Sequence, residues 1–118
     1  MIEELVARVF ASRNAAHLAH WKETSGFRHE TLGAFYDDVI DSIDDIVEAH
    51  QGAFDLIEIN GLPKQPKVDD IVKLLEDDMV FIGENRKKIT NGLPAIDNLL
   101  QGLEHVYLRT LYKLRKLK

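Results

Sequence analysis

The chain has 118 residues, a formal net charge of −5 at pH 7 and no cysteine. This length allows one domain with a substantial core, and the absence of cysteine excludes disulfides, thiolate metal sites and a cysteine nucleophile. The negative charge argues against nonspecific binding to phosphate backbones, so we do not expect DNA binding. Because we find no signal peptide or membrane-length apolar run, we expect a single cytoplasmic domain over residues 1–118 that binds no membrane.

Apolar residues recur at helical spacing along nearly the whole chain, and no segment alternates strictly enough to compete as a strand. A first helix is predicted over residues 3–23, after which the serine and glycine of "TSGF" interrupt the pattern. A second helix is predicted to begin near Arg28. Its end is left open, because Gly52 could cap it while residues 53–59 could continue it or form a short separate piece.

The clearest break is the segment 60–67, "NGLPKQPK", because its glycine and two prolines favour turns and cannot all lie inside a helix. A third helix is predicted over residues 68–90, with Gly92 as its C-cap. Pro94 suits the first turn of a fourth helix. Four amphipathic helices with short connections pack most simply as a four-helix bundle, so the predicted class is all-α.

Histidines and carboxylates gather on the first two predicted helices. The two histidines of the first helix fall within its apolar face at about 100° per residue, and the others follow one flank of the second helix. Imidazole nitrogen and carboxylate oxygen together suit ferrous iron, zinc or manganese, and acids four residues apart can reach one ion. The candidate metal ligands are His17, His20, His29, Asp37, Asp44 and Glu48.

Plainer interpretations of the same residues stay open. A histidine on an apolar face is often a hydrogen-bonded core residue, and "DDVIDSIDDIVE" could be an ordinary solvated helix face. No glutamate lies three residues ahead of any histidine, so a di-iron site of the ferritin type within one bundle is not expected. Arg13 is expected to snorkel or to pair with an acid of another helix, and Trp21 and Tyr107 to be core or interface aromatics.

An all-α pyrophosphatase that uses Mg²⁺ is a further alternative. Such enzymes hold metal with paired acidic motifs on two helices, and the pairs Asp37/Asp41 or Asp41/Asp44 could form the first of these. The acids at 76–78 are not followed by another acid at the required spacing. We therefore interpret Asp77 and Asp78 as solvated helix residues.

The order of these features resembles the Dps family of miniferritins. In that family a His-Trp pair ends the first helix, a glycine turn and a phenylalanine follow, and a second histidine opens the next helix. An Asp and a Glu four residues apart come later on that helix. The matching residues here are His20, Trp21, Gly26, Phe27, His29, Asp44 and Glu48, and the segment "LLQGLEHVYLRTLYKL" is similar to the family's last helix.

This resemblance implies a ferritin-like bundle that assembles into a homo-oligomeric shell through its first and second helices. It also implies an iron site between two chains, with His20 and His29 from one chain and Asp44 and Glu48 from its neighbour. The implied activity is that of a ferroxidase, in which peroxide oxidises Fe(II) at carboxylate-bridged iron ions and ferric mineral collects inside the shell.

The chain also departs from the family pattern. The turn between His20 and His29 is shorter, which leaves His17 as a replacement or an additional ligand. Gly33 stands where the family has a carboxylate, so Asp37 or Glu30 would have to compensate for it. The chain has no lysine-rich N-terminal arm. The alternative function is therefore a metal-free oligomeric or partner-binding bundle that has lost ferroxidase activity.

Overall fold

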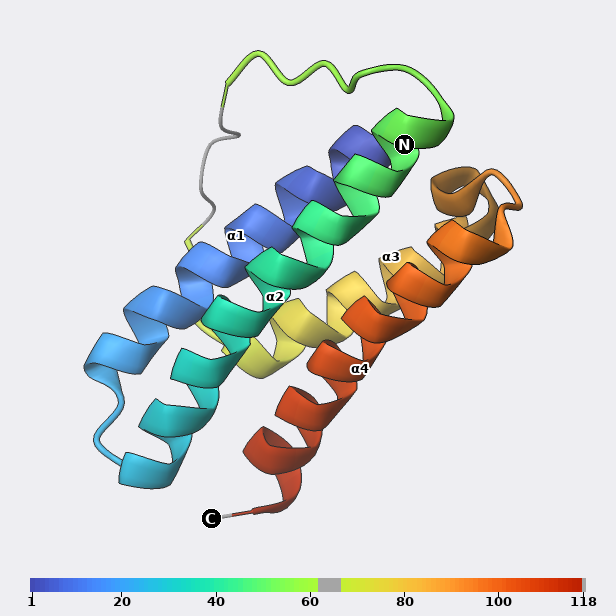
Figure 1. Ribbon diagram of the computed structural model, residues 1–118. Coiled ribbons are helices and arrows are strands. Elements are labelled where there is room, and N and C mark those ends of the chain that lie inside the picture. Colours follow the sequence, from blue (N-terminus) through green and yellow to red (C-terminus); the bar gives the residue numbers. More distant parts are fainter. Residues whose placement is uncertain (62–66, 118) are drawn as a thin grey trace.

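The computed structural model describes residues 1–61 and 67–117, which form four α-helices and contain no strand (Figure 1). The helices are α1 (Ile2–Lys22), α2 (Gly26–Ala53), α3 (Ile71–Thr90) and α4 (Pro94–Lys116). The predicted all-α helical bundle is confirmed. The middle of the predicted break, residues 62–66, lies outside the described residues. None of the described helices has both the length and the apolar composition needed to cross a bilayer.

Side-chain caps fix where two of the helices begin. The Ser25 hydroxyl accepts a hydrogen bond from the backbone N–H of Arg28 (3.3 Å), so α2 begins just before the predicted position. The Asp70 carboxylate accepts one from the N–H of Lys73 (3.2 Å). The predicted start of the third helix at residue 68 was therefore wrong, because Asp70 caps the helix that follows it.

The structure also shows where α2 and α3 end and where α4 begins. Helix α2 ends at Ala53 and does not continue through residues 54–59. Helix α3 is closed by Asn91, whose φ of 52° is left-handed, and Gly92 follows with φ 76°. The predicted cap therefore lies one residue late, since asparagine also tolerates this conformation. Pro94 opens α4 as predicted.

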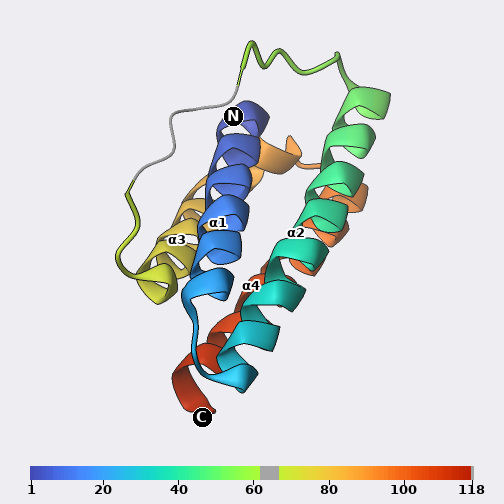
Figure 2. The same cartoon turned by 90° about the vertical axis from the view of Figure 1, so that its left-hand side faces the viewer.

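The four helices form two antiparallel hairpins, α1–α2 and α3–α4 (Figures 1 and 2). The connection over residues 54–70 joins the end of α2 to the opposite end of the bundle, where α3 begins (Figure 1). Helices α2 and α3 consequently run in the same direction. Helix α1 packs on α2 and α3, and α4 packs on α2 and α3, so each helix has antiparallel neighbours.

The core contains the predicted apolar stripes of all four helices. Each fully buried leucine, isoleucine or phenylalanine contributes about 1.5 to 3 kcal/mol through removal of its surface from water. Trp21 is 67% exposed and is therefore not a core aromatic of this chain, and its alternative role as an interface aromatic stays a prediction. Fully buried side chains of the core include Leu5, Val9, Leu32, Phe35, Ile43, Ile46, Leu75, Ile82, Leu100, Leu103 and Tyr107.

Candidate metal-binding site

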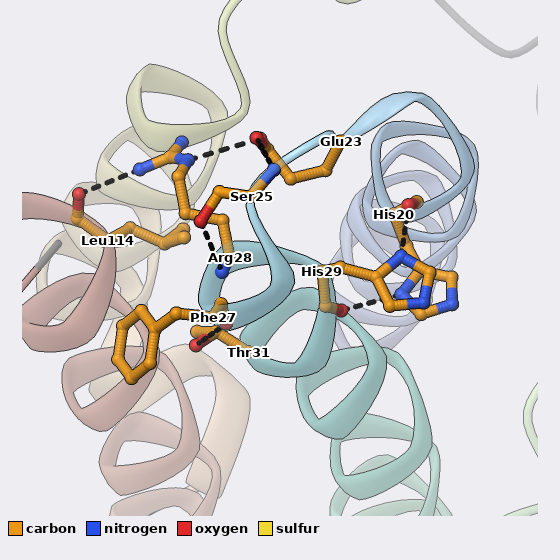
Figure 3. Close-up of polar contacts among 8 residues, drawn as sticks. All are labelled: His20, Glu23, Ser25, Phe27, Arg28, His29, Thr31 and Leu114. Carbon is orange, nitrogen blue, oxygen red and sulfur yellow. Dashed lines mark hydrogen bonds and ion pairs between the residues drawn. The ribbon is translucent and has the colours of Figure 1, made fainter.

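Two histidines join the end of α1 to the start of α2 (Figure 3). The rings of His20 and His29 stack, with centroids 3.6 Å apart and planes 19° from parallel. Nδ1 of His20 lies 2.6 Å from the backbone carbonyl oxygen of His29, and Nδ1 of His29 lies 2.7 Å from that of His20. The two residues therefore hold each other by reciprocal hydrogen bonds.

These bonds fix the tautomer of both rings. A carbonyl oxygen only accepts, so each Nδ1 must carry the proton, and in a neutral imidazole Nε2 then keeps a lone pair. A histidine that binds a metal usually donates its other ring N–H to a carbonyl or carboxylate in this way. In Figure 3 the remaining ring nitrogens lie on the side away from the two carbonyl oxygens. Each ring thus keeps Nε2 outside the reciprocal hydrogen bonds.

The turn that brings these histidines together is anchored to α4. The guanidinium of Arg28 donates to Glu23 (3.1 Å) and to the carbonyl of Leu114 (2.9 Å) (Figure 3). Hydrogen bonds from the Ser25 backbone N–H and then from Arg28 lower the pKa of Glu23. The α1–α2 turn is consequently tied to the last turn of α4, which limits movement of the histidine pair.

His17 belongs to an aromatic cluster next to this pair. Its ring stacks on Tyr36 of α2, with centroids 4.0 Å apart, and lies 4.7 Å from the ring of Trp21. The rings of His17 and His20 are 6.3 Å apart. The guanidinium of Arg13 lies 5.2 Å from the Tyr36 centroid, and no acid pairs with it in the described part of the chain. Of the two predicted roles of Arg13, pairing with an acid of another helix is not found there, and the half-buried side chain leaves the snorkelling alternative as a prediction.

The predicted acidic ligands lie elsewhere on α2. Asp37, Asp44 and Glu48 are all exposed. At about 1.5 Å of rise per residue, Asp44 lies about 22 Å from His29 along the helix axis, and Glu48 about 28 Å. Within residues 1–61 and 67–117, no group of three or more histidine or acidic side chains could hold a metal ion. One chain therefore brings together His17, His20 and His29 but not the acids.

Sequence reasoning missed a second polar cluster, which lies inside the bundle. Asp78 was predicted to be solvated, but it is 2% exposed, so that prediction was wrong. Its carboxylate accepts hydrogen bonds from the hydroxyls of Ser12 and Tyr107 (2.7 Å for Tyr107) and pairs with Arg8 at 3.4 Å. Burial raises the pKa of Asp78 despite these bonds, and it raises the pKa of Tyr107 well above its usual value.

A signal for the buried acid was present in the sequence. Asp78 lies three residues after Leu75 and four before Ile82, which are apolar residues at helical spacing. Positions three and four apart share one helix face, so Asp78 had to point inward with them. Its charge obscured this spacing.

Comparison of the chain with protein-family models, with curated proteins and with solved structures found no match. The geometry of the chain itself therefore carries the functional argument. That geometry places the histidine pair at one end of the α1–α2 hairpin and the exposed acids Asp44 and Glu48 further along α2.

Proposed function

We propose that this chain is the subunit of a Dps-like miniferritin that forms a homo-oligomer and binds ferrous iron between two chains. His20 and His29 of one subunit bind the ion together with Asp44 and Glu48 of the partner subunit. The observation that carries this proposal is the reciprocal hydrogen bonding of the two histidines, which leaves a lone pair on each Nε2. Imidazole and carboxylate donors in one site suit Fe(II).

A twofold axis would bring the histidine pair and the acids together. Residues 36–38 lie midway between the histidine end and the acidic end of this surface of α2. If two copies of α2 pack antiparallel about that point, the imidazoles of each chain face the acids of the other, and the two copies of Asp37 lie near the axis. The exposed indole of Trp21 would then be covered by the partner, which is the usual explanation for a large apolar side chain on a surface.

The topology supports a ferritin-like assignment. A bundle with two antiparallel hairpins and one long crossover connection is the arrangement of ferritin-like folds. In this chain the crossover is the connection over residues 54–70 between the parallel helices α2 and α3. Up-and-down bundles with only short loops lack such a connection.

Iron is the substrate in this proposal. Two Fe(II) ions each give one electron to hydrogen peroxide, which takes up two protons and leaves as two water molecules. The protein's part is to orient donors for Fe(II) and, through the carboxylates, to stabilise the higher charge of the ferric product. Asp37 supplies further negative charge beside the site, and His17 keeps the ring of Tyr36 packed next to His20.

One observation favours a second function, a metal-free oligomeric module. Gly33 replaces a carboxylate of the Dps pattern and so removes a charge and a bridging group. A bundle that has lost this group could keep the subunit interface without the metal chemistry.

The test compares Fe(II) binding by the wild type and by the His29→Ala, Asp44→Ala double variant, without oxygen, together with the mass of each in solution. We expect an oligomer that binds Fe(II), and a loss of affinity of about tenfold or more in the double variant. Asp45→Ala is the matched control, because this exposed acid lies about 100° further around α2 and its loss should leave binding unchanged. A monomer whose Fe(II) uptake is the same in all three proteins contradicts the proposal.

A further inference from the structure

The ring of His20 packs against α2 at Gly33. A Cβ atom added at Gly33 would lie 3.2 Å from Cε1 and 3.3 Å from Nδ1 of His20. Both distances are shorter than the usual contact of about 3.5 to 4.0 Å between such atoms. A Cβ added at any of the other glycines meets no atom of residues 1–61 and 67–117 within 4 Å. Gly33 is therefore the glycine whose missing side chain makes room for another group.

The ring of His20 has little freedom to move away. Its Nδ1 is held by the 2.6 Å hydrogen bond to the carbonyl of His29, and the ring also contacts two other rings. The ring of His29 lies 3.6 Å away in a parallel stack, and the ring of Tyr36 meets it edge-on at 5.4 Å. A methyl group at position 33 must therefore lengthen the hydrogen bond or disturb the stack.

We infer that Gly33 positions the imidazole of His20: because position 33 has no side chain, the His20 ring packs against α2 there and both histidines keep their reciprocal hydrogen bonds. The inference rests on the proposed function. In this arrangement a carboxylate side chain at position 33 would meet the ring of His20. Gly33 is a positioning residue, since it acts on the metal only through His20.

The missing carboxylate also changes which ions the site prefers. Nitrogen donors favour Zn²⁺ and Fe²⁺, whereas Mg²⁺ and Ca²⁺ take oxygen ligands almost exclusively. With two imidazoles on one side, the site discriminates against Mg²⁺ more strongly than one that has a carboxylate at position 33.

The first measurement uses metal-free protein and reports on positioning alone. Long-range ¹H–¹⁵N correlation spectra of the histidine rings identify which nitrogen carries the proton. We expect the Nδ1–H tautomer for His20 in the wild type and a mixed or shifted signal in Gly33→Ala. Gly83→Ala is the matched control, because position 83 is also helical but is exposed and has open space for a methyl group. Alanine favours helices, so both variants are expected to fold.

The second measurement is calorimetric titration of the same proteins with Zn²⁺ and with Mg²⁺. We expect Gly33→Ala to bind Zn²⁺ about tenfold or more weakly than the wild type, and Gly83→Ala to bind it equally. Gly33→Glu should reduce the preference for Zn²⁺ over Mg²⁺, because it displaces an imidazole and adds a carboxylate.

The outcomes separate this inference from the proposed function. If Gly33→Ala keeps both the His20 tautomer and the Zn²⁺ affinity of the wild type, the inference is wrong and the proposed function stands. If the wild type shows the Nδ1–H tautomer but binds neither Zn²⁺ nor Fe(II), the proposed function is wrong. The role of Gly33 in metal binding is then wrong as well.

Discussion

The two polar clusters of this bundle differ in how much of their hydrogen-bonding capacity the chain itself uses. Asp78 lies in the interior, and its carboxylate is bonded by Ser12, Tyr107 and Arg8, which come from α1 and α4. The histidine pair lies on the hairpin surface, and each ring uses one nitrogen for the backbone and keeps the other. The carboxylate of the first cluster is bonded by three side chains, whereas each histidine of the second cluster has one ring nitrogen outside these hydrogen bonds.

Whether the hydrogen-bonding groups of a cluster are all used within the chain indicates its role better than its residue types do. A cluster with all groups used is expected to be structural, and one with groups left over is expected to bind a ligand. A buried carboxylate with its bonds satisfied specifies how three helices fit together, because no other packing satisfies it as well. Imidazoles fixed in one tautomer with an unused lone pair are prepared for a ligand that the chain itself does not supply. The account predicts that changes to the first cluster alter stability and that changes to the second alter metal affinity.

The largest effect is expected for Asp78→Ala. The substitution leaves the buried hydroxyls of Tyr107 and Ser12 without their acceptor, and such losses cost about 3 to 5 kcal/mol of unfolding free energy. Urea unfolding measures it directly. Asp77→Ala is the control, because Asp77 is exposed and its pair with Lys73 is worth less than about 1 kcal/mol. Equal unfolding free energies of the two variants would mean that the hydrogen bonds of Asp78 do not stabilise the fold.

Tyr107→Phe should have a smaller effect of about 1 to 2 kcal/mol. It removes one hydrogen bond to Asp78 and keeps the buried ring, which packs edge-on against Phe35 at 5.2 Å. Unfolding of this variant and of the double variant with Asp78→Ala gives the coupling between the two residues. We expect the double variant to lose less unfolding free energy than the sum of the two single losses. A loss equal to that sum would argue against a direct bond between the two residues.

The Asp78→Asn variant isolates the charge of the interior cluster. Because burial raises the pKa of Asp78, the folded state holds this proton more tightly than the unfolded state does. The resulting stability is fully present below the unfolded pKa and is lost as the pH rises through the raised folded pKa. The unfolding free energy of the wild type minus that of Asp78→Asn should therefore fall across this range and then level off. A difference that stays constant or rises with pH would contradict the assignment.

The smallest effect on stability is expected when Gly83 and Gly33 are each replaced by alanine. Gly83→Ala should raise the unfolding free energy by about 0.5 to 1 kcal/mol, because alanine loses less backbone entropy in a helix and meets no neighbour there. Thermal unfolding followed by circular dichroism detects a gain of this size. Gly33→Ala should gain less, since its methyl group meets His20, and a larger gain at position 33 than at 83 would remove the steric argument.

The helices and the core could be predicted because they depend on local spacing. The stripes of apolar residues gave all four helices, and Pro94 gave the start of α4. The start of α3 was misplaced because Val68 continued the apolar pattern, although the Asp70 side chain caps the helix only after it. Asp78 was misplaced because its charge was given more weight than its spacing.

The candidate site could be predicted only as residues, and its geometry could not. The spacing that puts His20 beside His29 depends on the length and path of the turn at Ser25, which no periodicity reports. The role of Gly33 is also invisible in the sequence, because the contact joins residues on two different helices. The acids could be placed on a flank, but a single chain does not show which surface would cover them.

Subunit complementation tests the central claim most directly. One variant, His20→Ala with His29→Ala, lacks the imidazole side of the site, and the other, Asp44→Ala with Glu48→Ala, lacks the acid side. Neither should bind Fe(II) tightly alone. When equal amounts are unfolded together and refolded, half of the twofold pairs contain one chain of each kind and have one complete site out of two.

The account predicts that the mixture recovers about a quarter of the wild-type number of tight Fe(II) sites, as twofold symmetry requires. A mixture that binds no more Fe(II) than the separate variants would contradict a site shared between two chains.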